Sequence, residues 1–192
     1  MKPDLILPTN GNLIQAFGVN AQFYSDPKYG GIKSHNGVDF LTNHGWPIYA
    51  SHDGFAEYQI DPSGGHGVVI TSKDGSWKSI YWHLTDGTEP QFKSPLFNKK
   101  NIPVEMGDVI GYSDNTGAST GTHLHWGVKL CENGETINKD NGWLGAVNPM
   151  FYCNGYTPEQ FFELKKKVTL LQQLVQLWIK LKTLLDKGGI IS

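Results

Sequence analysis

Apolar and polar residues alternate along much of the first 130 residues, in short runs that glycines, prolines and an Asp-Gly pair separate. This period of two is typical of β-strands with one buried face. Asp74-Gly75 between two such runs is a strong hairpin signal. We expect a mostly β fold with an antiparallel sheet of sandwich or barrel type, long loops at 19–34 and 85–103, and a loop that enters a strand within 35–41. Further strands are expected near 13–17, 47–50, 55–60, 66–71, 76–83, 104–112 and 123–128.

A different pattern starts near the C-terminus. Thr157 is typical of a helix N-cap, Pro158 of the first helical position and Gln160 of the third. The pattern predicts a C-terminal amphipathic α-helix, and it divides the chain into a domain at 1–156 and a helix at 157–192. Two apolar stripes run along that helix: Leu170, Leu174, Leu177, Leu181 and Leu184, and beside them Leu164, Val168, Leu171, Val175, Trp178 and Leu185.

An apolar face this wide must be buried against another surface. Three partners are consistent with the sequence: the helix's own domain, other copies of the chain, or a membrane surface. Lys165, Lys166 and Lys167 separate the stripes from the preceding domain, which favours a projecting helix that associates with other copies. Lys180 and Lys182 lie among the apolar residues, and the polar face is rich in glutamine, so membrane-surface contact is the weaker alternative.

Composition and charge add bounds on the partners. The 192 residues are 39% hydrophobic, with 23 glycines and 10 prolines, as in a turn-rich globular protein. A formal net charge of −2 provides no basic field, so we expect no nucleic-acid partner. The N-terminal residues contain no apolar run long enough for a signal peptide, and no segment reaches the roughly 18 apolar residues of a membrane span. We therefore expect any export signal to be absent or already removed.

Two cysteines, Cys131 and Cys153, are present. Neither has a partner at zinc-finger spacing, which makes a thiolate metal site an unattractive interpretation. A single disulfide and two free thiols are both consistent with the sequence, and a disulfide would fit an oxidising compartment.

The candidate chemistry lies on the predicted strand at 123–128. Successive side chains of a strand alternate between faces, so His123 and His125 share one face with Gly127. The two histidines start about 7 Å apart, close enough to serve one small cavity. The opposite face is apolar and should join the core: Leu124, Trp126 and Val128.

Two more segments carry histidines in comparable settings. His35 and Asp39 are four residues apart, an even spacing that lets both side chains point the same way from an extended segment. On the predicted strand at 76–83, His83 should share a face with Tyr81, opposite an apolar stripe. Each motif alone is also consistent with histidines on an exposed surface.

Taken together, these residues fit a catalytic zinc site. Such sites use three protein ligands drawn from His, Asp and Glu and leave a fourth position open. His35, Asp39 and one of His123 and His125 would supply that set. Zinc lowers the pKa of a bound water to about 7 and polarises a carbonyl, which is the chemistry needed to hydrolyse an amide.

Three motifs occur in a fixed order along the chain, at 35–39, 81–84 and 116–126. They read H-N-G-V-D, Y-W-H-L and T-G-A-S-T-G-T-H-L-H-W, and together they point to one protein family. The chain closely resembles the lysostaphin-type, or LytM-type, zinc metallopeptidases that cleave bacterial peptidoglycan. The segments at 47–50 and 107–111 also look like connecting strands of that family. The resemblance implies a zinc endopeptidase that cuts cross-bridge or stem peptides, one zinc per chain, and an extracytoplasmic location in the periplasm, the cell wall or the medium.

Carried over by motif position, the resemblance makes His35, Asp39 and His125 the zinc ligands. It makes His83 and His123 the catalytic pair, in which His123 accepts a proton from water and His83 orients the water or stabilises developing negative charge. The family also has a tyrosine upstream of the first ligand, and Tyr29 is the nearest match. The remaining histidines match no motif and should be surface or turn residues: His44, His52 and His66.

A second interpretation keeps the fold and removes the chemistry. Some relatives are catalytically silent modules that bind and activate another cell-wall hydrolase. Those relatives lose metal ligands, whereas here every motif position is filled, so we favour the enzyme. A closed structural zinc site would not need the additional His83 and His123.

Overall fold

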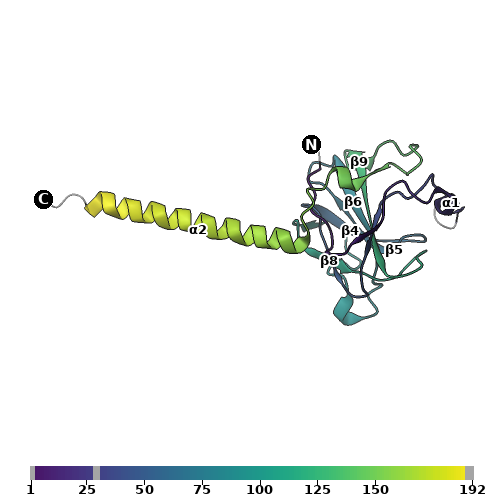
Figure 1. Cartoon of the computed structure of the whole chain (residues 1–192), viewed down its shortest axis with the longest axis horizontal. Coiled ribbons are helices and arrows are strands. Elements are labelled where there is room, and N and C mark those ends of the chain that lie inside the picture. Colours follow the sequence, from purple (N-terminus) through teal and green to yellow (C-terminus); the bar gives the residue numbers. More distant parts are fainter. Residues whose placement is uncertain (1–2, 28–30, 189–192) are drawn as a thin grey trace. The chain divides into compact units, whose positions relative to one another are not determined.

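The computed structural model describes residues 3–27 and 31–188 and confirms the mostly β fold with one long C-terminal helix (Figure 1). Two short 3₁₀ helices, η2 (Pro90–Phe92) and η3 (Pro149–Phe151), and a single turn of helix, α1 (Ala21–Tyr24), lie among the strands. The long helix is α2 (Pro158–Gly188). The strands are β1 (Leu13–Gln15), β2 (Val38–Leu41), β3 (Pro47–Tyr49), β4 (Gly54–Asp61), β5 (Gly65–Thr71), β6 (Trp77–Leu84), β7 (Ile102–Val104), β8 (Val109–Tyr112), β9 (His123–Glu132), β10 (Glu135–Thr136) and β11 (Ala146–Val147).

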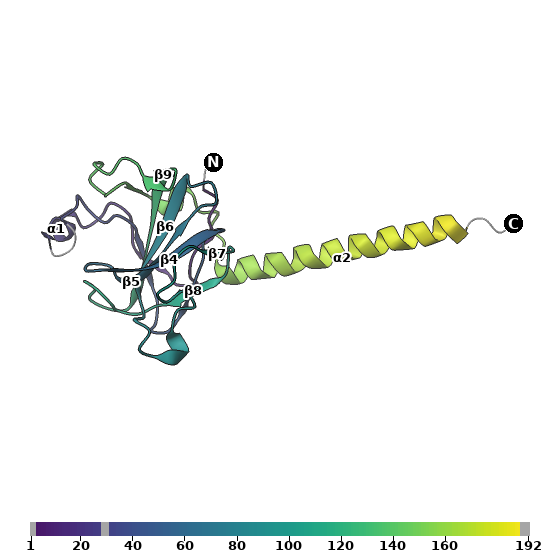
Figure 2. The same cartoon turned by 180° about the vertical axis from the view of Figure 1, so that it is seen from behind.

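Over the described residues, the main sheet has the strand order β1-β2-β9-β6-β5-β4-β7, with antiparallel pairing throughout. Figure 2 labels β4, β5, β6, β7 and β9 of this sheet in a view from behind. The short strands β10 and β11 also pair with β9, and β3 and β8 form a separate two-stranded sheet. The Lys73-Asp74-Gly75 turn joins β5 to β6 as predicted, because Gly75 adopts the left-handed conformation that this turn requires. The segment expected to be one loop at 85–103 contains η2 and the start of β7.

The core lies between the main sheet and the β3–β8 pair. The predicted apolar face of β9 is fully buried, at Leu124, Trp126 and Val128. Ile48 of β3 and Ile110 of β8 pack into the same cluster. The polar face of β9 is thereby left free to carry a site.

The chain divides into two compact units, residues 1–158 and 159–192. In the second unit, the apolar side chains between Leu164 and Leu181 are exposed, among them Trp178. The side chains of Leu184 and Leu185 lie outside the described part of the chain. In the described residues, no helix combines the length and apolar character that crossing a membrane requires.

Both cysteines are free thiols: Cys131 is buried at the end of β9, and Cys153 is half-buried after η3. The sequence is consistent with either a disulfide or two free thiols, and the structure contains two free thiols.

Candidate metal centre and surrounding cleft

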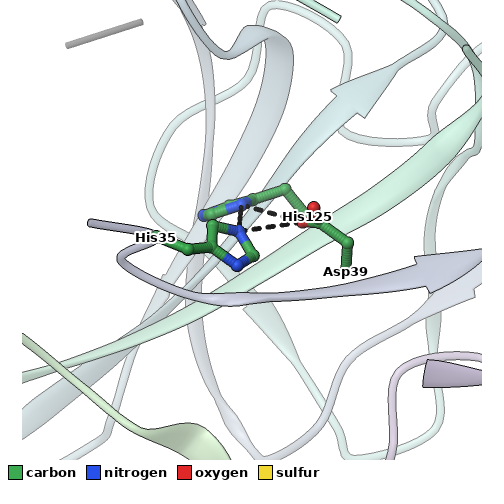
Figure 3. A group of neighbouring side chains, drawn as sticks. All are labelled: His35, Asp39 and His125. Carbon is green, nitrogen blue, oxygen red and sulfur yellow. Dashed lines mark hydrogen bonds and ion pairs between the residues drawn. The ribbon is translucent and has the colours of Figure 1, made fainter. Parts of the chain in front are cut away.

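The register between β2 and β9 brings the sequence-predicted residues together. Asp39 of β2 lies opposite His125 of β9, and Leu41 lies opposite His123. His35 comes from the loop that enters β2, and its side chain is fully buried. The side chains of His35 and Asp39 meet at one point although His35 lies in the loop before β2, as Figure 3 shows.

Three atoms from these residues form a small triangle. His35 Nε2 lies 3.0 Å from His125 Nδ1 and 3.1 Å from Asp39 Oδ1. His125 Nδ1 lies 3.1 Å from the same carboxylate oxygen. Tetrahedral zinc at 2.0 to 2.1 Å from its ligands would separate ligand atoms by about 3.3 Å. The two nitrogens and the oxygen therefore have the identity and the spacing of three zinc ligands.

The tautomer of His35 suits ligation. Its Nδ1 lies 3.0 Å from the carbonyl oxygen of Ala16, which can only accept a hydrogen bond. Nδ1 must therefore carry the proton, and Nε2 keeps its lone pair toward Asp39 and His125. A ligating histidine whose other nitrogen donates to a carbonyl is the usual supporting arrangement at metal sites.

Electrostatics keep this cluster in the protonation state that a metal needs. Burial raises the pKa of Asp39, but its contacts with His125 and His35 outweigh burial and hold that pKa well below its usual range. Burial lowers the pKa of His125 despite the neighbouring carboxylate. At neutral pH the cluster thus offers a carboxylate and a neutral imidazole.

Gly37 allows the close approach between β2 and the His125 ring. A Cβ built on Gly37 would lie 2.7 Å from two ring atoms of His125 and 2.6 Å from the carbonyl oxygen of Trp126. Any larger residue would displace the imidazole or the strand. The glycine between His35 and Asp39 is therefore part of the geometry of the site.

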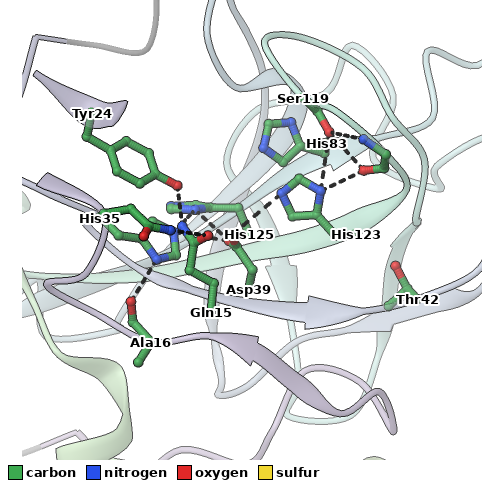
Figure 4. A network of polar contacts seen from close by, with 12 residues as sticks. Gln15, Ala16, Tyr24, His35, Asp39, Thr42, His83, Ser119, His123 and His125 are labelled. Carbon is green, nitrogen blue, oxygen red and sulfur yellow. Dashed lines mark hydrogen bonds and ion pairs between the residues drawn. The ribbon is translucent and has the colours of Figure 1, made fainter. Parts of the chain in front are cut away.

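His123 lies beside the triangle (Figure 4). Its Nδ1 is 2.7 Å from the carbonyl oxygen of Gly121 and 3.2 Å from Ser119 Oγ. Since the carbonyl only accepts, Nδ1 carries the proton, and Nε2 lies 3.8 Å from Asp39 Oδ2 with its lone pair free.

His83 lines the same cleft, with its ring 4.5 Å from that of His123 between centroids. Its Nδ1 donates to the carbonyl oxygen of Thr116 at 2.7 Å. Burial, together with the neighbouring His123 and His125, lowers the pKa of His83 to about 3. His83 is therefore a neutral imidazole whose Nε2 can accept a hydrogen bond.

The prediction that Tyr81 and His83 share a face is wrong. Tyr81 is fully buried in the core, whereas His83 lines the cleft together with Trp82. The backbone of His83 has a φ of 64°, in the left-handed region, and the β5–β6 register shifts near this end of the strand. This local irregularity breaks the alternation and turns the imidazole toward the cleft.

A tyrosine that the sequence interpretation missed also borders the cluster. The ring of Tyr24 stacks on His35 with centroids 5.0 Å apart, and its hydroxyl accepts a hydrogen bond from Gln15 Nε2 at 2.6 Å. Burial and the charge of Asp39 raise the pKa of Tyr24, which keeps the phenol protonated. The predicted Tyr29 lies outside the described residues. The loop has no periodicity, so only the short helix α1 reveals which tyrosine reaches the site.

The other three histidines differ from one another. His44 is exposed and contacts Asp114 and Glu89, as expected for a surface residue. His66 is half-buried and bonded to the hydroxyl of Tyr58. His52 lies in the bend between β3 and β4, as a turn residue would, but it is buried and not on the surface; it bonds the carbonyl of Asp53 and the hydroxyl of Ser79.

A cleft of about 360 Å³ contains this cluster and continues along the polar face of β6 and β9. Asp39, His83, His123 and His125 line it near the cluster, with Tyr24 and Gln15 at one side. The arrangement can hold one metal ion in a buried triangle and present two further histidines, His83 and His123, to a bound peptide.

Comparison with known proteins agrees with this geometry. The chain is 34% identical over 113 residues to an uncharacterized metalloprotease of Haemophilus influenzae, covering 58% of this chain and 22% of the relative. It is 35% identical over 108 residues to the peptidoglycan DD-endopeptidase ShyA of Vibrio cholerae, covering 56% and 22%. The chain thus spans about a fifth of the length of these curated relatives.

Solved structures agree in fold. The catalytic domain of the antimicrobial peptidase lysostaphin from Staphylococcus simulans aligns with a TM-score of 0.58 at 26% identity, covering 74% of this chain and 92% of that domain. A zinc-containing peptidase from Vibrio cholerae aligns with a TM-score of 0.51 at 27% identity, covering 71% and 39%. The profile of peptidase family M23 matches residues 33–139, more than half of the chain. The chain therefore belongs to peptidase family M23.

Proposed function

We propose that this protein is a zinc-dependent endopeptidase that hydrolyses peptide bonds of bacterial peptidoglycan. The observation that carries the proposal is the triangle of His35, Asp39 and His125, which opens into a cleft lined by two further histidines. The names of relatives supply the substrate: one is a peptidoglycan DD-endopeptidase and another, from Staphylococcus capitis, is a glycyl-glycine endopeptidase.

In this proposal His35, Asp39 and His125 hold one zinc ion per chain. When bound there, zinc would acidify a water molecule and polarise the substrate carbonyl. Support for zinc comes from the donor set, since two imidazoles and one carboxylate are typical ligands of catalytic zinc. The name of the zinc-containing peptidase among the similar structures points the same way.

His123 is the proposed general base. The hydrogen bond from Nδ1 to Gly121 holds its ring so that Nε2, which makes no hydrogen bond to that carbonyl, faces Asp39. That nitrogen is positioned to take a proton from the attacking water and to return it to the leaving amine.

His83 is the proposed residue that orients the water. Because Nδ1 donates to Thr116 and the low pKa keeps the ring neutral, Nε2 can accept a hydrogen bond but cannot donate one. This favours orientation of water over stabilisation of negative charge. Tyr24 suits the latter role, since its hydroxyl accepts from Gln15 and retains a proton to donate.

The proposal places the protein outside the cytoplasm, where peptidoglycan lies. The alternative, a silent module that activates another hydrolase, is less favoured because all three ligand positions are filled and the ligand atoms converge. A binding module would need neither a general base nor a second neutral histidine beside the triangle.

The test compares single variants on purified cell walls, with mass spectrometry of the released fragments. Zinc-loaded His123→Ala and His83→Ala should retain zinc and fold while losing about 10² to 10⁴ in rate, the usual contribution of a positioned acid or base. His44→Ala is the matched control, because His44 is exposed and does not line the cleft. Near-normal wall hydrolysis by zinc-loaded His123→Ala would remove His123 from the mechanism.

A further inference from the structure

The cleft does not end at the metal cluster. Past His125, the same face of β9 carries Gly127 and Lys129, and both line the cleft. On the adjacent strand β6, Ile80 lies opposite Gly127 and Lys78 lies opposite Lys129. The cleft thus runs from the metal cluster over an uncharged floor to a pair of lysines.

The two lysines occupy a position that the fold alone does not explain. Like charges directly opposite each other on antiparallel strands are destabilising. Burial and the neighbouring Lys78 lower the pKa of Lys129. Among the described residues, neither lysine makes an ion pair. In the described part of the chain, the ammonium group of Lys78 donates only a long hydrogen bond, of 3.5 Å, to the carbonyl of Gly134.

An acidic group that lines the same cleft already accepts hydrogen bonds from its own turn. Asp61 also lines the cleft, and its charge acts on Lys129. However, Asp61 Oδ1 accepts hydrogen bonds from the backbone N–H groups of Ser63 and Gly64 and from the Ser63 hydroxyl, so it caps its own turn. The ammonium groups of Lys78 and Lys129 remain available to an anion that enters the cleft.

The spacing suits a peptide substrate. Lys129 follows His125 by four residues, and a strand rises about 3.3 Å per residue, so their Cα atoms are about 13 Å apart. That is the length of about four residues of extended peptide. Gly127, midway, adds no side chain of its own beside Ile80, which leaves room for a peptide chain to lie along the floor between the two ends.

We propose that Lys78 and Lys129 bind a free carboxylate of the peptide substrate, about four residues from the bond that is cut. This inference rests on the proposed function and narrows its substrate class to wall peptides that carry a carboxylate beyond the scissile bond. A bound carboxylate offsets the repulsion between the two ammonium groups and accepts charge-assisted hydrogen bonds from both. A bridge of uncharged residues alone offers the pair no partner.

The experiment uses three soluble cross-linked stem-peptide dimers: one with free carboxylates, one amidated at its C-terminus, and one amidated at its side-chain carboxylates. For the zinc-loaded full chain, one amidation should lower kcat/KM about 10- to 100-fold, the effect expected for losing a hydrogen-bonded charge. The amidated dimer that is cleaved more slowly shows whether the bound carboxylate is the C-terminal one or a side-chain one.

Variants connect that preference to the lysines. The double variant Lys78→Gln/Lys129→Gln should cleave the free and the amidated dimers at equal rates. Those rates should be close to the rate at which the wild type cleaves the amidated dimer that it disfavours. Lys139→Gln is the control, because Lys139 is exposed, contacts Glu135 and does not line the cleft. This control should keep the wild-type preference.

Two failures are distinguishable. Equal cleavage of all three dimers by the wild-type protein would overturn the carboxylate subsite and leave the endopeptidase intact, without requiring any variant to fold. A persisting preference in the double variant would also overturn it. Absence of cleavage of the dimers and of whole walls by zinc-loaded protein would overturn the proposed function, and the subsite with it.

Discussion

The two units of the chain treat their apolar residues in opposite ways, and two tryptophans show the contrast. Trp126 in β9 has 0% of its surface exposed, whereas Trp178 in α2 is 61% exposed. In the first unit, each apolar strand face meets apolar residues of the same unit, such as Ile48 and Ile110. In the second unit, as far as residue 188, the apolar stripes lie on a single helix, and that unit offers no second element to pack against them. The strands of the first unit therefore bury their apolar faces against one another, whereas the helix of the second unit keeps an apolar face that needs a partner.

The spacing of the exposed face indicates which partner to expect. Apolar residues at alternating steps of four and three form the seam of a coiled coil, in which helices pack on one another. We therefore propose that α2 associates with other copies of this chain and that Trp178 lies within that contact. Contact with a membrane surface is the alternative, and Lys180 and Lys182 among the apolar residues weigh against it.

The largest expected effect separates the two tryptophans. Trp126→Ala should lower the free energy of unfolding of the first unit by about 3 to 5 kcal/mol, because it leaves a cavity in a packed core. Trp178→Ala should change the same quantity by less than about 0.5 kcal/mol, because Trp178 belongs to the second unit and not to the core of the first. Urea denaturation of both variants measures this. A comparable loss in Trp178→Ala would mean that α2 belongs to the core of the first unit.

A second effect should be confined to the first unit. Burial lowers the pKa of His52 to about 4 from an ordinary value of 6.5. The unfolded chain therefore binds more protons between these values, so stability is full above pH 6.5 and falls as the pH drops toward 4. At 1.36 kcal/mol per pKa unit, the loss approaches about 3 kcal/mol.

The measurement is the free energy of unfolding between pH 7 and pH 4 for the wild type and for His52→Gln. The wild type should show the steeper decline, and the difference between the two curves isolates His52 from the other titrating groups. Parallel curves would show that His52 does not titrate with unfolding.

The third prediction concerns the helix itself. Deleting residues 159–192 should leave hydrolysis of a soluble peptide within about twofold, because the residues of the cleft all lie in the first unit. The deletion should reduce the oligomeric mass measured by light scattering. A full-length protein that is already monomeric, with an insoluble or unfolded truncated form, would contradict the self-association proposal.

The sequence was most informative where the backbone is regular. Alternation along β9 predicted both the buried face of Trp126 and the free face of His125, and the spacing of His35 and Asp39 predicted their convergence. Periodicity carries such information because it fixes the direction of each side chain relative to the core.

Prediction failed where the backbone is irregular or the contacts are distant in sequence. The left-handed backbone conformation of His83 turns its side chain from the core face of β6 to the cleft, and no pattern in the sequence predicts that conformation. Tyr24 reaches His35 from a loop, and His52 is drawn into the core by Ser79 and Trp77. Each depends on a tertiary contact that single-strand periodicity does not encode.

The zinc content of purified variants tests the central claim most directly. Elemental analysis should find about one zinc per chain in the wild type and in His123→Ala, and clearly less in His35→Ala, Asp39→Ala and His125→Ala, since each of these loses a ligand. Unchanged zinc in both His35→Ala and His125→Ala would contradict the assignment of the metal centre.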